Sequence, residues 1–158
     1  MSVFEEKLIA APQFLPLSSN GLDNGISVHQ LDGASQDVQR IELVFPAGKT
    51  MVDNPLVGSI FSKLILSGSK KISAQVLNQQ LDQWGVFAET EIGQTETILR
   101  IYALNRVLDK LIPFIAEWIP QLALPQDEFE REKTKHFQKF KVNLEKVNVL
   151  AARGFRKN

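Results

Sequence analysis

Polar and apolar side chains alternate in four stretches of the chain, and each alternation predicts a half-buried β-strand. The first two stretches are residues 26–31 and 38–48, and a short glycine-containing loop, GASQD, separates them. Such a loop predicts that these two strands pair as a hairpin. The other two stretches are residues 86–92 and 95–104, and Gly93-Gln94 between them predicts a second hairpin.

Four further stretches repeat their apolar residues about every 3.6 positions, which predicts amphipathic helices. The first helix is expected to begin after Asp53 or Asn54 and the second after Ser73, since these residue types have side chains that cap helix N-termini. Asn105 is expected to cap the third helix, in which Pro113 should introduce a kink or shorten the first part. The fourth helix is expected over about residues 127–152.

The order of these elements is two strands, two helices, two strands and two helices. Paired strands with helices gathered between them predict an α+β fold, in which an antiparallel or mixed sheet carries its helices on one face. Prolines and a Ser-Ser-Asn-Gly run punctuate residues 1–21, which are expected to form an extended lead-in. Residues 22–158 are expected to form a single domain.

Composition supports a folded core and removes several kinds of chemistry. Hydrophobic residues make up 44% of the 158 residues, which is enough for a core. The 18 Lys and Arg residues balance 18 Asp and Glu, so net charge gives no attraction to nucleic acid or to an anionic membrane. The absence of cysteine excludes disulfides, thiolate zinc sites and cysteine nucleophiles in this chain.

The N-terminal stretch MSVFEEKLIAAPQF carries two glutamates and no long apolar core, so it lacks the features of a signal peptide. No apolar run approaches the ~20 residues that a membrane-spanning helix needs. We therefore expect a cytoplasmic protein that does not associate with membranes. The periplasm is the alternative, because a chain without cysteine fits either compartment.

The strongest charge asymmetry lies in residues 131–158, which carry nine Lys and Arg residues and two glutamates. A basic helix of this kind is a candidate for nucleic-acid binding. The solvated face of an amphipathic helix is the favoured interpretation, because Phe137 and Phe140 fit the apolar stripe and do not interleave with the lysines as a stacking platform. We therefore expect no nucleic-acid partner.

Candidate polar sites are few. His29 and His136 are not paired with other residues at the spacing of metal ligands, and we interpret both as structural or solvated. Ser59, Ser62 and Lys63 have the spacing i, i+3, i+4, which predicts one outward patch on the first helix. One hypothesis for this patch is a Ser–Lys pair with Lys63 as nucleophile or base, a chemistry that would require burial of the lysine.

Several segments are similar to those of the pitrilysin/insulinase-type peptidases, which include the mitochondrial processing peptidases. LDNGISV at 22–28 resembles the family's opening strand, and residues 42–90 resemble its run of strand, motif helix and second helix. TETILRIYAL at 95–104 resembles the strand that follows, and LPQDEFEREKTKHFQKF at 124–140 resembles the opening of its long helix. The resemblance spans nearly the whole chain and implies the fold of one half of such a metallopeptidase.

In active members the motif helix carries H-x-x-E-H, whose histidines bind Zn²⁺ and whose glutamate activates a water, while a distal glutamate completes the site. Aligned on Gly68, the glycine after the motif, the matching positions in this chain are Ser59, Ser62, Lys63 and, on the long helix, Gln138 or Lys139. A serine hydroxyl is a poor zinc ligand, and a charged lysine repels a dication. The resemblance therefore implies a member without metal, cofactor or peptidase activity.

Within this family an inactive half pairs with an active half around an unfolded peptide. The resemblance thus implies a non-catalytic subunit whose partners are an active zinc peptidase subunit of the same family and unfolded peptides. The family domain continues beyond Asn158, so we expect a domain truncated at its C-terminal end, with an exposed sheet edge open to self-association. The alternatives are a stand-alone peptide- or nucleic-acid-binding module, and an enzyme of different chemistry that uses Lys63.

Overall fold

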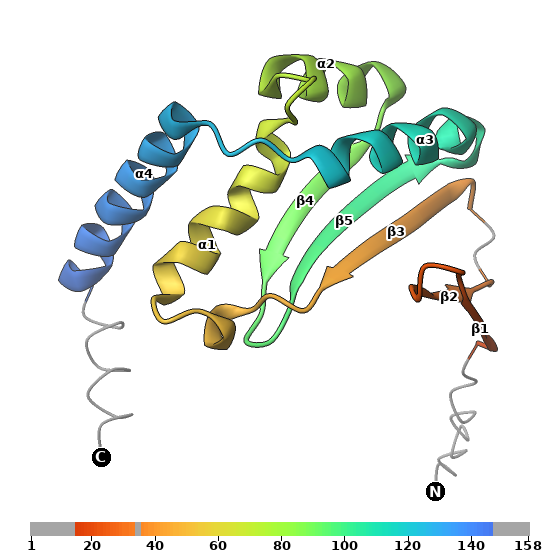
Figure 1. The fold of residues 1–158 in the computed structure, drawn as a ribbon, viewed down its shortest axis with the longest axis horizontal. Coiled ribbons are helices and arrows are strands. Elements are labelled where there is room, and N and C mark those ends of the chain that lie inside the picture. Colours follow the sequence, from red (N-terminus) through yellow and green to blue (C-terminus); the bar gives the residue numbers. More distant parts are fainter. Residues whose placement is uncertain (1–14, 34–35, 147–158) are drawn as a thin grey trace, which may run out of the picture. The chain divides into compact units, whose positions relative to one another are not determined.

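The computed structural model describes residues 15–33 and 36–146. The chain divides into two compact units, one up to Asp37 and one from Val38 onward, and each is described by itself. Figure 1 shows the elements of both units. The predicted end of the fourth helix, at about residue 152, lies outside the described residues.

The first unit contains a β-hairpin of strands β1 (Leu17–Gly21) and β2 (Ser27–Leu31), which pair antiparallel along all five residues. The turn between them contains Asp23-Asn24-Gly25, a sequence typical of tight turns. Asn24 Oδ1 accepts a hydrogen bond from the Ile26 amide at 3.1 Å, and Gly25 adopts a positive φ of 82°. Such a φ strains residues with a Cβ, so the glycine permits the tight turn that joins β1 to β2.

This hairpin corrects the pairing that the sequence suggested. Residues 26–31 were expected to pair with 38–48, but β2 pairs with β1, which lies entirely within the expected lead-in of residues 1–21. The hairpin therefore spans the expected boundary between the lead-in and the domain. The physical reason is that the Asp-Asn-Gly turn is the shorter and tighter of the two connections, so it closes the local pair.

The second unit is built on a three-stranded antiparallel sheet in the order β3-β5-β4. Its strands are β3 (Val38–Phe45), β4 (Phe87–Ile92) and β5 (Thr97–Leu104). The predicted hairpin around Gly93-Gln94 is confirmed as β4 and β5. Strand β3 pairs with β5 along all eight residues, so β5 is central and the other two strands are the edges.

Of the four α-helices in the described residues, three lie on one face of this sheet and the fourth packs beside the first, as Figure 1 shows, and the predicted α+β fold is confirmed. They are α1 (Pro55–Leu64), α2 (Ala74–Trp84), α3 (Leu108–Trp118) and α4 (Gln126–Glu145). Short 3-10 turns flank them: η1 (Lys49–Met51), η2 (Ile65–Ser67), η3 (Asn105–Val107) and η4 (Ile119–Gln121). Among the described helices, none combines the length and apolar character that crossing a membrane requires.

Two of the predicted helix caps are present. The Asn54 side chain accepts a hydrogen bond from the Leu56 amide, and the Ser73 side chain accepts one from the Val76 amide. The predicted cap of the third helix is wrong, because Asn105 begins the 3-10 turn η3 and α3 starts three residues later without a side-chain cap. Pro113 lies inside α3, which continues on both sides of it, and the three residues before this helix form the 3-10 turn η3.

The core lies between the sheet and the helices. Alternate residues of β5 are buried and face the helices, whereas the residues between them are only half-buried. Trp118 of α3 and Leu77 of α2 are fully buried and belong to the same cluster as Leu99 and Ile101 of β5. This cluster holds α2 and α3 against the sheet through apolar contacts.

Candidate functional site

The predicted patch on α1 is not wholly outward, which corrects the sequence interpretation. Ser62 is buried, with 1% of its surface exposed, while Ser59 is half-buried and Lys63 is exposed. The helix lies close to the sheet at this level, since a Cβ on Gly58 would come within 2.8 Å of the Ile92 side chain on β4. Small residues on this side of α1 allow the close approach, and they bury position 62.

The Ser62 hydroxyl is bound within its own helix. Its Oγ donates a hydrogen bond to the Ser59 carbonyl oxygen at 2.9 Å. This bond satisfies a buried polar group that burial would otherwise penalise. Position 62, where the resemblance implies the glutamate that activates a water, therefore holds a small hydroxyl packed into the protein.

The Lys63 side chain reaches from α1 to the sheet. Its Nζ donates a hydrogen bond to the Thr90 carbonyl oxygen on β4 at 3.2 Å. A Ser–Lys catalytic pair needs a hydrogen bond between hydroxyl and amine, yet Ser62 and Lys63 donate to two different backbone carbonyls. The geometry therefore gives no support to Lys63 as a base for Ser62.

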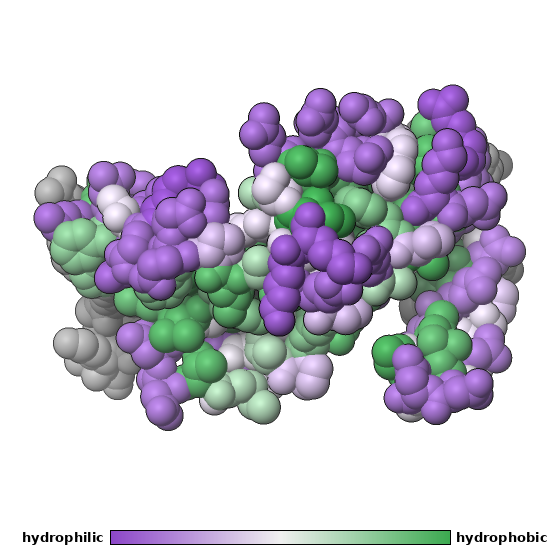
Figure 2. Space-filling model, turned by 45° about the horizontal axis from the view of Figure 1, so that its top comes forward, coloured by the Kyte–Doolittle hydropathy of each residue, from purple (hydrophilic) through white to green (hydrophobic). Residues whose placement is uncertain are grey.

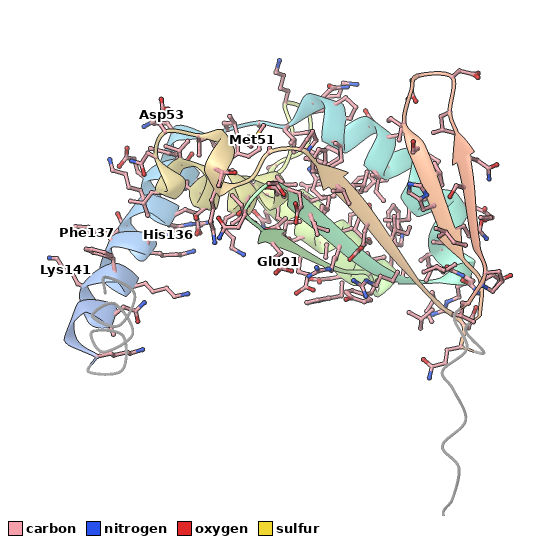
Figure 3. All side chains as sticks on the ribbon, turned by 90° about the horizontal axis from the view of Figure 1, so that it is seen from below. Met51, Asp53, Glu91, His136, Phe137 and Lys141 are labelled. Carbon is pink, nitrogen blue, oxygen red and sulfur yellow. The ribbon has the colours of Figure 1, made fainter. Side chains whose placement is uncertain are left out.

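The distal positions, Gln138 and Lys139, lie on α4 and are exposed. In Figure 3 the labelled His136 lies on the other side of the α4 ribbon from Phe137 and Lys141. Lys141 Nζ is 4.6 Å from the centroid of the Phe137 ring, a cation–π contact on the exposed side of the helix. Neither distal position supplies a carboxylate.

Within the described residues, no group of three or more His, Asp or Glu side chains is placed to hold a metal ion. His29 lies in the first unit, where its Nδ1 is 2.8 Å from Ser19 Oγ on the paired strand. His136 is half-buried on α4 of the second unit. The donor set that remains near α1 consists of hydroxyls and an ammonium, which suits a zinc ion poorly.

The face of the sheet opposite the helices carries an ion-pair cluster around Arg100 that the sequence analysis did not identify. Arg100 is 2.7 Å from Glu42, 2.5 Å from Glu91 and 3.9 Å from Glu89, and Arg40 also pairs with Glu42. Figure 3 shows Glu91 on this face. The sequence contains a signal for this cluster, since its residues occupy polar positions of three strands. This signal can be used only when the pairing of β3 with β5 is known.

Hydrogen bonds within this cluster change the ionisation of its members. Bonds from Arg40 and then Arg100 hold the pKa of the Glu42 carboxyl below its ordinary value. Bonds to Glu42 and Glu91 raise the pKa of Arg100 further above its already high value. Glu42 and Arg100 thus stay charged at neutral pH and give this face a polar centre.

A second feature that the sequence analysis missed is an apolar cleft between α1 and α4, of about 240 Å³. Its lining is Val57, Phe61, Leu64, Leu124, Gln126 and Phe129. Figure 2 shows exposed apolar side chains beside the polar surface of α4. The α1 residues of this lining, Val57, Phe61 and Leu64, are spaced i, i+4, i+7, so the cleft lies on a different side of the helix from the motif positions.

Several basic side chains of α4 are paired with glutamates on the same helix, which the composition alone did not show. On α4, Lys133 pairs with Glu130 at 3.2 Å, Lys135 pairs with Glu132 at 2.5 Å, and Arg131 pairs with a glutamate three residues before it. These cations are partly neutralised by neighbours on their own helix. The described part of α4 therefore gives little support to nucleic-acid binding.

Comparisons with known proteins match this chain by its fold. No protein-family model matches the sequence, and a comparison with curated proteins finds no relative. A solved structure of a peptidase M16 inactive domain from Pseudomonas fluorescens is 18% identical, with a TM-score of 0.77 over 87% of this chain and 34% of that one. This chain spans about a third of that structure's length.

Two further solved structures also have a fold similar to that of this chain. A protease from Helicobacter pylori is 19% identical, with a TM-score of 0.67 over 77% of this chain and 30% of that one. The periplasmic protease PqqL from Escherichia coli is 16% identical, with a TM-score of 0.73 over 94% of this chain and 17% of that one. The predicted cytoplasmic location stays a prediction. The fold of this chain is that of M16 peptidase domains, in agreement with its resemblance to the pitrilysin/insulinase-type peptidases.

Proposed function

We propose that this chain is a peptidase-like module without hydrolytic activity, which pairs with an active zinc peptidase subunit and helps to form the chamber that holds an unfolded peptide. The likeness in fold to an M16 inactive domain supports the first part of this proposal. The pairing and the chamber follow from the family resemblance. The chain spans about a third of that structure, so the whole assembly belongs to the proposal.

One observation carries the proposal: the three positions of α1 that match the motif hold two serines, which are poor zinc ligands, and a lysine, which cannot ligate zinc when charged. Ser62 is buried and bonded to its own helix, and Lys63 is bonded to β4. A metal at this place would meet an ammonium instead of an imidazole. The chain thus has the fold of these peptidases, but the side chains at these positions do not form a set of zinc ligands.

The test is to purify the tagged protein from its own cells and to identify co-purifying chains by mass spectrometry. We expect a partner that carries H-x-x-E-H. The reconstituted pair should cleave unfolded peptides, and a chelator should abolish the cleavage. Alanine substitution of the partner's motif histidines should also abolish it, whereas Ser62→Ala in this chain, the matched control, should leave it unchanged.

Two outcomes would contradict the proposal. One is stoichiometric zinc in this chain purified alone, measured by elemental analysis. The other is chelator-sensitive peptide cleavage by this chain without a partner. Cleavage by a partner that is equally fast without this chain would remove the proposed role in the chamber.

A further inference from the structure

Strand β4 has a free edge. Within the described chain, β4 pairs with β5 on one side only. The unpaired N–H and C=O groups of an edge strand can form hydrogen bonds with a strand of another molecule. Helix α1 packs close to this strand, as the short distance between a Cβ on Gly58 and the Ile92 side chain shows.

The hairpin register defines which groups point to the free side. The Gly93 amide donates to the Glu96 carbonyl oxygen at 2.8 Å, which closes the β4–β5 hairpin. Hydrogen-bonded and non-hydrogen-bonded pairs alternate in antiparallel strands. Counting from this closing bond, Thr90 and its partner Leu99 form a non-hydrogen-bonded pair. The N–H and C=O of Thr90 therefore point away from β5, near the middle of the free edge.

Lys63 is bonded to this outward-pointing carbonyl, since its Nζ donates a hydrogen bond to the Thr90 oxygen at 3.2 Å. We propose that Lys63 guards the free edge of β4 and prevents pairing with a strand from a second copy of this chain. An incoming strand would have to displace the ammonium from the carbonyl and remove a charged group from water. Lysines on edge strands oppose association for the same reason.

This inference gives a physical role to the lysine at a former motif position. The side chain of Lys63 is long enough to reach the strand from α1, and its charge stays at the edge of the sheet. The inference goes beyond the proposed function and does not depend on it, because its test uses this chain alone. A failed test of one leaves the other standing.

The experiment measures self-association of the purified chain by sedimentation velocity over a range of concentrations. Lys63→Met keeps the length of the stem but removes the charge and the donor, whereas Lys63→Arg keeps both. Lys110→Met on α3 is the matched control, since it removes one exposed charge from another helix. Circular dichroism checks that every variant is folded. Hydrogen exchange with mass spectrometry then locates the protected strand.

We expect the dimer dissociation constant of Lys63→Met to fall at least about tenfold, or ~1.4 kcal/mol, below that of the wild type. Amide exchange in residues 87–92 should slow as the concentration rises. Lys63→Arg and Lys110→Met should behave as the wild type. Unchanged association of Lys63→Met, protection of β3 instead of β4, or equal association of Lys110→Met would each overturn the proposal. Where Lys63→Met is not folded, Lys63→Leu, which also lacks the charge and the donor, takes its place with the same criteria.

Discussion

Two neighbouring residues of β5 illustrate how differently the two faces of the sheet are stabilised. Leu99 is fully buried against the helices, whereas Arg100 points to the opposite face, where it pairs with glutamates on both neighbouring strands. Burial of apolar surface stabilises the first face whatever the charge state. The second depends on ion pairs, which pH and salt can weaken. Apolar burial on one face is thus the main source of stability, and changes to the charged groups on the other face should cost little.

The largest expected effect comes from placing a charge on the buried side. Ser62→Glu restores the carboxyl that the family resemblance implies, but position 62 is buried beside the sheet. An unpaired carboxylate there should lower the free energy of unfolding by about 3–5 kcal/mol. Urea unfolding followed by tryptophan fluorescence measures this, since both tryptophans lie in the second unit.

The matched control is Val44→Glu, which adds the same group at an exposed position of β3. It should change the free energy of unfolding by less than about 1 kcal/mol. Equal losses for the two variants would show that position 62 is not buried, and would remove the basis for the comparison of the two faces.

Next in size is truncation of the core. Leu99→Ala should cost about 2–5 kcal/mol, because it removes buried methyl groups and leaves a cavity. Leu104→Ala, on the same strand but half-buried, is the control and should cost less. The measurement is again urea unfolding. A larger loss for Leu104→Ala would place the main core on the other face of the sheet.

The smallest effect concerns the ion-pair cluster and its pH dependence. The pKa of Glu42 is lower in the folded chain than its ordinary value, so its ion pairs stabilise the fold at neutral pH. This stabilisation is present above the ordinary pKa and is lost as the pH falls through the lower folded value. At pH 7 the free energy of unfolding of the wild type should exceed that of Glu42→Gln by under about 1 kcal/mol.

The difference between the two proteins should shrink as the pH drops below about 4, the ordinary range of a glutamate pKa. Thermal unfolding of both proteins between pH 7 and pH 3 measures it, and high salt at pH 7 should reduce it as well. A difference that stays constant over this pH range would show that the carboxylate charge of Glu42 contributes nothing.

Local signals in the sequence predicted much of the fold. The caps Asn54 and Ser73, and the turn at Gly93-Gln94, act on neighbours a few residues away, and all three are present in the structure. The pairing of β3 was not predictable in this way. Its partner lies more than fifty residues later in the chain, and the turn before β3 suggested a nearer strand.

The burial of the candidate site was not predicted from the sequence. A serine is small and polar, so the sequence pattern placed Ser62 with Lys63 on an outward patch. Packing decides otherwise, because Gly58 lets α1 lie against β4 and the Ser62 hydroxyl can bond within its helix. The Arg100 cluster escaped prediction for a related reason, since it joins residues of three strands whose order was not known.

The register of β3 against β5 has a consequence for the rate of folding. Val38 pairs with Leu104, so the chain between them must be brought together before this half of the sheet can form. Closing so long a loop costs entropy before any contact compensates for it, whereas the β4–β5 hairpin closes locally. We therefore expect the hairpin to form early and the pairing of β3 to be the slower step that completes the sheet.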